Sequence, residues 1–303
     1  MSEGEDRGPS RVSRRVVLGA SGVLGAVVAG AALTSASVRE VPRKIVRHAA
    51  GVAGAPVPQP RPVVRVEQVR SAARNREINL VTVYPDQLRA KDLPVCLMLH
   101  GRFGTARELA NIPSALARAM RRPGARRFAF VAVDGGNSYW HRNRSKDDPM
   151  AMLLEEVPRW LAERGLGGRD RMPFAVAGVS MGGFGALLYA RRRREQGRPL
   201  QAVAAVSPAL MLSWKEMKKR DAFHDATDWA AMDPLRNIDK LGNVPLGVWC
   251  GSEDWFIAGN RRFIRAAKPK LASITPGGHT GEYFQRIYPQ MVTFIGKHVP
   301  REK

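Results

Sequence analysis

One serine of this 303-residue chain lies in a sequence that could make it a nucleophile. Ser180 is the centre of Gly178-Val179-Ser180-Met181-Gly182, which matches the pattern G-x-S-x-G. An apolar run ends at this serine and a glycine-rich helical pattern follows it, so the context predicts a nucleophile elbow that presents the hydroxyl at the carboxyl end of a sheet. The alternatives are a glycine-rich turn without chemistry and a phosphate-binding loop. The lack of a lysine after the glycines argues against the second.

A nucleophilic serine needs a base and an acid, which follow it along the chain in the order acid, then histidine, when the serine sits on this kind of elbow. His279, in the glycine loop TPGGHTG, occupies the place expected for the base, whereas His298 at the end of the last helical pattern is better explained as a surface residue. Glu253 and Asp254 follow the apolar run VWCGS, and either carboxylate could orient an imidazole. The other would then be a helix N-cap.

Acyl transfer also requires N–H donors for the oxyanion of the tetrahedral intermediate. Met181, directly after the nucleophile, should supply one of them, and Arg102 or Phe103, in the loop after the run CLMLHG, should supply the other. His100 precedes this loop, and we interpret it as a residue that shapes the loop, because it follows the wrong strand to be the base.

The elements that must position these residues alternate between strands and helices. Strands are expected at 63–71, 77–85, 94–101, 128–136, 173–180, 201–210, 244–254 and 270–279, and helices at 108–120, 150–166, 181–194, 256–267 and 283–299. Pro158 should kink or restart the second helix, and a polar insertion surrounds residues 215–229. Alternation of this kind predicts an α/β fold in which a mostly parallel sheet carries helices on both faces.

The N-terminal residues have the form of an export signal. Arg14-Arg15 precede the mildly apolar run 16–33, which resembles a twin-arginine signal, and cleavage is expected after Ala36. We therefore predict a signal peptide at 1–36, a Pro/Gly/Ala-rich linker at 37–62 and one catalytic domain at 63–303. The protein would be extracellular, periplasmic or in the cell wall. The alternative is an uncleaved membrane anchor, although the glycine content of the run makes it a poor spanning helix.

The formal net charge of +22 would suit a nucleic-acid or envelope-polymer partner, but no nucleic-acid-binding motif is present. The densest basic cluster, at 190–198, is interpreted as a solvated helix end. Cys96 and Cys250 lie in strand-like runs and are expected to be buried free thiols. No metal or cofactor is expected, and the sequence does not decide the oligomeric state.

Five motifs, LMLHG, VDGGNSYW, AGVSMGGFGAL, WCGSED and PGGH, occur in this order. Together they resemble the esterase-D-like branch of the α/β-hydrolases, which includes feruloyl and acetyl-xylan esterases, S-formylglutathione hydrolase and mycolyltransferases. The resemblance implies an α/β-hydrolase fold with Ser180 as nucleophile, Asp254 as acid and His279 as base. It also implies an oxyanion site at the backbone of Arg102 and Met181. The pocket candidates are Phe103, Asn137, Tyr139 and Trp140.

These observations predict an exported serine esterase that acts on a small-molecule or cell-envelope ester. One alternative is an acyltransferase, in which a sugar or lipid hydroxyl replaces water. The other is an inactive cell-wall binding protein with the hydrolase fold. An intact and correctly ordered triad argues against the inactive protein.

Overall fold

The computed structural model describes residues 62–86, 91–143 and 146–301. The predicted signal peptide and all of the predicted linker except Pro62 lie outside these residues. Within the described ranges, no helix is long and apolar enough to cross a membrane.

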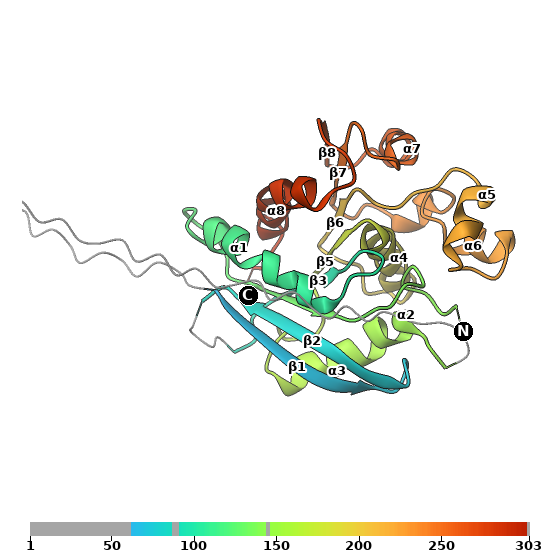
Figure 1. Cartoon of the computed structure of the whole chain (residues 1–303). Coiled ribbons are helices and arrows are strands. Elements are labelled where there is room, and N and C mark those ends of the chain that lie inside the picture. Colours follow the sequence, from blue (N-terminus) through green and yellow to red (C-terminus); the bar gives the residue numbers. More distant parts are fainter. Residues whose placement is uncertain (1–61, 87–90, 144–145, 302–303) are drawn as a thin grey trace, which may run out of the picture. The chain divides into compact units, whose positions relative to one another are not determined.

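The strands form one eight-stranded sheet in the order β1-β2-β4-β3-β5-β6-β7-β8 (Figure 1). They are β1 Val63–Ser71, β2 Arg76–Tyr84, β3 Val95–Leu99, β4 Ala129–Val133, β5 Ala175–Val179, β6 Ala202–Val206, β7 Leu246–Gly251 and β8 Leu271–Thr275. β2 is antiparallel to both of its neighbours, and the strands from β4 to β8 across the sheet are parallel. The structure thus confirms the predicted mostly parallel sheet.

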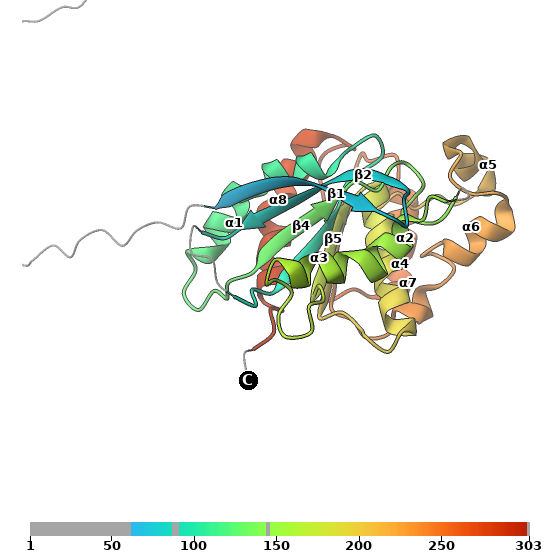
Figure 2. The same ribbon diagram turned by 90° about the horizontal axis from the view of Figure 1, so that it is seen from below.

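Helices cover both faces of this sheet (Figures 1 and 2). The α-helices are α1 Pro113–Met120, α2 Pro149–Ala151, α3 Val157–Glu163, α4 Met181–Glu195, α5 Trp214–Met217, α6 Ala226–Met232, α7 Ile257–Ala267 and α8 Gly281–Gly296. The 3-10 helices are η1 Ala106–Asn111, η3 Lys218–Arg220 and η4 Ile238–Leu241, and η2 Met152–Glu156 is a π-helix. α1 and α8 pack on one face, whereas α3 and α4 pack on the other.

Strand β3 shows how the sequence builds these two layers. Leu97 packs into the core under α3 and α4, and its neighbours Cys96 and Met98 pack into the core under α1 and α8. Successive side chains of a strand point to opposite faces, so a strand buried on both faces must be apolar at every position. All five residues of β3 are buried, which explains its uninterrupted apolar sequence.

Prolines mark a change of helix type within two of the predicted helices. Pro113 separates the 3-10 helix η1 from α1, because a proline favours the first turn of a helix and disrupts its interior. Pro158 lies in the first turn of α3, directly after the π-helix η2, so the restart predicted at this proline is confirmed. Cys96 and Cys250 are buried and free, as predicted.

The basic end of α4 is only partly solvated, which corrects the interpretation of residues 190–198. Arg191 and Arg193 are buried. Arg191 donates to the carbonyl of Ala231 at 2.6 Å, and Arg193 donates to the hydroxyl of Tyr189 at 3.0 Å. Long side chains can bury their stems and serve as packing residues. The bond from Arg191 to Ala231, and a bond of 3.2 Å from Arg193 to the carbonyl of Pro173, join α4 to neighbouring segments.

Candidate active site

Ser180 lies on a strained turn between β5 and α4. Its backbone has φ 56° and ψ −119°, a conformation that non-glycine residues rarely adopt. A Cβ at Gly178 would overlap the carbonyl of Gly182, and a Cβ at Gly182 would overlap the carbonyl of Leu99. The glycines of the motif are therefore required for strand, turn and helix to approach so closely.

His279 joins Ser180 to Asp254. The Nε2 atom of His279 lies 2.8 Å from Oγ of Ser180, and its Nδ1 atom lies 2.8 Å from Oδ2 of Asp254. Asp254 follows β7 and is 1% exposed, and its second oxygen accepts a hydrogen bond from the N–H of Phe256 at 2.8 Å. Three residues from the ends of β5, β7 and β8 are thus aligned in one hydrogen-bonded chain.

Glu253, the alternative acid, does not contact His279. Its side chain is exposed, and its N–H donates to the carbonyl of Gly277 at 3.0 Å. The geometry therefore pairs the imidazole with Asp254.

Three aromatic rings surround His279, and no motif in the sequence marks them as a group. The ring centroids of Phe256 and Phe284 lie 5.0 Å from that of His279, and the centroid of Trp255 lies 5.2 Å from it. Trp255 is 74% exposed, so it forms an apolar rim beside the imidazole. Its position next to Asp254 was the one signal that could have identified it.

The loop after β3 passes directly beside Ser180. A Cβ at Gly101 would lie 3.6 Å from the Cβ of Ser180. Gly104 donates its N–H to the carbonyl of Gly101 at 3.1 Å, which closes a tight turn with Phe103 at φ 65°. The N–H of Phe103 donates to Oδ1 of Asn137 at 2.7 Å. Of the two residues considered as the second oxyanion donor, Phe103 is already bonded, which leaves Arg102.

His100 holds this loop against the loop that follows β4. Its Nδ1 donates to the carbonyl of Gly101 at 2.7 Å, and its Nε2 accepts from the N–H of Gly135 at 2.8 Å. Burial lowers the pKa of His100 below the usual 6.5, and the acceptor role of Nε2 requires the neutral ring. His100 thus shapes the loop, the role that the sequence suggested.

Two of the four pocket candidates are core residues. Tyr139 and Trp140 are 1% and 0% exposed. Both have positive φ, and the turn directs their side chains inward, where Tyr139 contacts Phe184 edge-on at 5.1 Å and Trp140 packs against Gly185. Burial raises the pKa of Tyr139 to about 12. The expectation that these two side chains line a pocket is therefore wrong.

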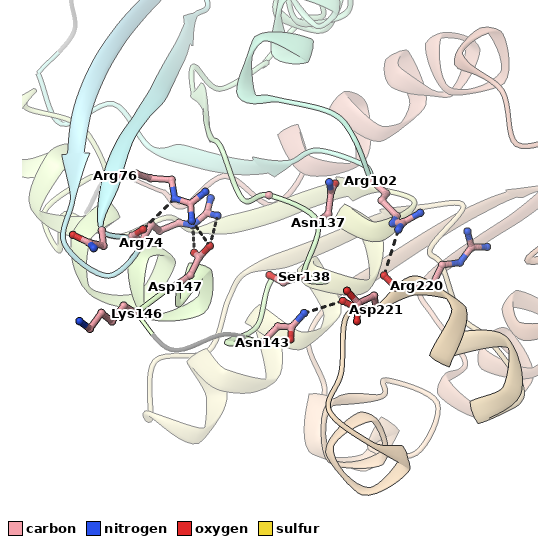
Figure 3. Close-up of a pocket in the computed structure, with 12 residues that line it drawn as sticks. Arg74, Arg76, Arg102, Asn137, Ser138, Asn143, Lys146, Asp147, Arg220 and Asp221 are labelled. Atoms are coloured by element: carbon pink, nitrogen blue, oxygen red, sulfur yellow. Dashed lines mark hydrogen bonds and ion pairs between the residues drawn. The ribbon is translucent and has the colours of Figure 1, made fainter.

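The other two candidates lie at the surface. Asn137 lines a cleft of about 660 Å³, and Phe103 is 75% exposed beside it. The cleft is lined by Arg74, Asn75, Arg76, Arg102, Gly136, Asn137, Ser138, Asn143, Lys146, Asp147, Arg220 and Asp221 (Figure 3). Ser180, Asp254 and His279 do not line it, and Arg102 connects the cleft to the turn beside Ser180. Most of these residues could not be recognised from the sequence because they come from segments far apart in the chain.

In the parts of the chain that the structure describes, no group of three or more His, Cys, Asp or Glu side chains is arranged to hold a metal ion.

The fold is that of the α/β-hydrolases, as comparison with solved structures shows. A ferulic acid esterase superposes with a TM-score of 0.65 at 21% identity, covering 78% of this chain and 99% of the other. An S-formylglutathione hydrolase from Staphylococcus aureus gives 0.59 at 18% identity, with coverage of 78% and 99%. An S-formylglutathione hydrolase from Agrobacterium tumefaciens gives 0.62 at 15% identity, with coverage of 79% and 96%.

The sequence itself identifies the family. The model of the family Esterase, described as "Putative esterase", matches residues 71–287, and the chain belongs to this family. Its chemistry is accordingly that of a serine hydrolase of carboxylic esters. No curated protein matches the sequence significantly.

Proposed function

We propose that the protein is an exported serine esterase that works through an acyl-enzyme on Ser180. The hydroxyl of Ser180 attacks the ester carbonyl while Nε2 of His279 takes its proton. The alcohol then leaves with that proton, and the acyl group stays on Ser180. Water attacks the acyl-enzyme by the same route, which releases the acid and restores the serine.

The observation that carries this proposal is the pair of 2.8 Å hydrogen bonds from His279 to Ser180 and to Asp254. A base must lie within hydrogen-bond reach of the proton it removes, and an acid must fix its tautomer. Asp254 fulfils this role in the proposal, since a buried carboxylate at Nδ1 stabilises the imidazolium that forms.

The backbone N–H groups of Met181 and Arg102 hold the oxyanion in this mechanism. Met181 begins α4, and the N-terminus of a helix favours negative charge. Arg102 follows Gly101, whose backbone passes beside Ser180. Two preorganised donors at this point would stabilise the charge that develops in the transition state.

Export is proposed from the sequence alone, on the twin arginines at 14–15 and the apolar run after them. N-terminal sequencing of protein recovered outside the cytoplasm tests it. A new N-terminus near residue 37 supports a cleaved signal, and an intact Met1 on membrane-bound protein supports the anchor instead.

Ser180→Ala tests the catalytic proposal. The kcat/KM for 4-nitrophenyl butyrate should fall by about a thousandfold or more, because the loss of one triad member removes nucleophilic catalysis. Ser207→Ala is the matched control, since Ser207 follows β6 as Ser180 follows β5 and also has positive φ. A fluorophosphonate probe should add its mass to Ser180 in the wild type and in the Ser207 variant only. Equal activity in the two variants, or labelling of another serine, would overturn the assignment.

A further inference from the structure

Two arginines at the cleft end beside the triad have incomplete hydrogen bonding. The Nε atoms of Arg102 and Arg220 are buried and have no hydrogen-bond partner. Among the described residues, neither arginine forms an ion pair with a carboxylate. The guanidinium of Arg102 donates to the carbonyl of Arg220 at 3.3 Å, which holds the two residues together (Figure 3).

Both arginines lie one contact away from the reacting groups. Arg102 follows Gly101, which lies beside Ser180. The guanidinium of Arg220 lies 6.0 Å from the ring centroid of Phe256, and that ring lies 5.0 Å from the ring of His279. A group bound between the arginines would therefore belong to a molecule that also reaches Ser180.

At the opposite end of the cleft, where Lys146 also lies, two arginines share one carboxylate. Arg74 and Arg76 both bind Asp147, each with one contact of 2.7 Å, and Arg74 is almost fully buried. Figure 3 shows this cluster across the cleft from Arg102. These two arginines are thus held by a carboxylate, whereas Arg102 and Arg220 have no carboxylate partner among the described residues.

A buried donor without a partner is costly, and a guanidinium binds carboxylate and phosphate oxygens through strong charge-assisted bonds. We propose that the preferred substrate is an ester that carries a carboxylate or phosphate, and that Arg102 and Arg220 bind this anionic group. The inference rests on the proposed function and extends it to a substrate class. The anionic group could belong to the acyl part or to the alcohol part, and the experiment distinguishes these.

The test compares each charged ester with an uncharged ester of similar size, which we call its twin. The acyl side is probed with mono-4-nitrophenyl adipate against 4-nitrophenyl heptanoate. The alcohol side is probed with 4-butyryloxybenzoate and 4-butyryloxyphenyl phosphate against 4-butyryloxybenzamide. After correction for the hydroxide-catalysed rate of each ester, at least one charged ester should have a kcat/KM about tenfold or more above that of its twin. The preference should decrease at high salt, since screening weakens interactions between accessible charges.

Arg220→Gln should reduce this charged-to-neutral ratio by about tenfold, and Arg220→Lys should restore part of it. Arg122→Gln is the matched control. It removes the same charge from an exposed position between α1 and β4, at the amino end of the parallel strands, and should leave the ratio unchanged. Equal losses in the two Gln variants would attribute the preference to the overall charge of the protein and would overturn the site.

Binding to Ser180→Ala protein separates this inference from the proposed function. Calorimetry with the preferred charged ester should show tighter binding than with its twin, and Arg220→Gln should abolish the difference. If no ester is hydrolysed but the charged one binds selectively, the esterase mechanism is wrong and the anion site is correct. The anion site is wrong if esters are hydrolysed with no charge preference, or if Arg220→Gln changes neither the charged-to-neutral ratio of kcat/KM nor the binding of the charged ester. Either result leaves the proposed esterase function unaffected.

Discussion

Two groups of residues near Ser180, the histidine wall and the arginine wall, differ in how completely their polar atoms are hydrogen-bonded. In the histidine wall, formed by Asp254, Phe256 and His279, both nitrogens of the imidazole and both oxygens of the carboxylate have partners. In the arginine wall, formed by Arg102 and Arg220, a buried nitrogen of each guanidinium lacks one.

The hydrogen bonds of the histidine wall are thus complete before substrate binds, whereas those of the arginine wall are left for the substrate to complete. Catalytic groups gain from preorganisation, because they then need no rearrangement in the transition state. Specificity groups can remain unsatisfied, because a substrate that lacks the matching group then leaves them unpaired. The histidine wall is therefore suited to chemistry and the arginine wall to selection.

The largest expected effect on activity comes from replacing the acid of the histidine wall. Asp254→Asn should lower kcat for 4-nitrophenyl butyrate by about a thousandfold or more, because an amide cannot stabilise the imidazolium and favours the wrong tautomer. Glu253→Gln, at the adjacent exposed position, should change it less than about twofold. The measurement is kcat at saturating ester. A large loss from Glu253→Gln with a small loss from Asp254→Asn would reverse the assignment.

His100 holds the loop that carries Arg102 against the loop after β4, and its removal should have the second largest effect. His100→Asn cannot span the carbonyl of Gly101 and the N–H of Gly135, so the Arg102 N–H should move away from the oxyanion. The expected loss in kcat is about ten- to a hundredfold for charged and neutral esters alike. This is less than the roughly hundred- to thousandfold loss caused by removing an oxyanion donor, because the N–H is displaced and not removed. His224→Asn is the control, since His224 is exposed. A loss confined to charged esters would mean that His100 supports the arginine wall alone.

The histidine wall could be predicted from the sequence, because each of its polar residues follows a strand. The strands are recognisable from their apolar runs, and parallel strands bring their carboxyl ends to one edge of the sheet. The sequence therefore predicts that Ser180, Asp254 and His279 lie at that edge, and in the structure they lie within hydrogen-bonding distance of one another. The choice between Glu253 and Asp254 depended on a resemblance, since two adjacent carboxylates have the same chemistry.

The arginine wall could not be predicted, because Arg102 lies in a loop and Arg220 ends a short 3-10 helix in the polar insertion. The two residues meet only through the paths of the turn after β3 and of the insertion that carries η3, and local sequence does not determine how such segments lie. The same limitation explains the error at Tyr139 and Trp140. Positive φ at both positions directs aromatic rings into the core, although their sequence would fit a pocket equally well.

The smallest expected effect concerns the pH dependence of folding. Burial lowers the pKa of His100 below 6.5 in the folded protein, so the unfolded chain binds a proton more readily there. The contribution of His100 to stability is thus complete above pH 6.5 and is lost as the pH falls. Each such proton changes the free energy of unfolding by up to about 1.4 kcal/mol per pH unit.

Urea unfolding between pH 7 and pH 5 should accordingly show a shallower loss of stability in His100→Asn than in the wild type. His141, whose pKa is also lowered by burial, contributes with the same sign in both proteins. Asp233, whose pKa burial raises to about 6, contributes with the opposite sign in both, because its stabilisation is lost as the pH rises. These contributions cancel in the difference between the two curves. Parallel curves would show that the ring that holds the Arg102 loop is free to take up a proton in the folded state.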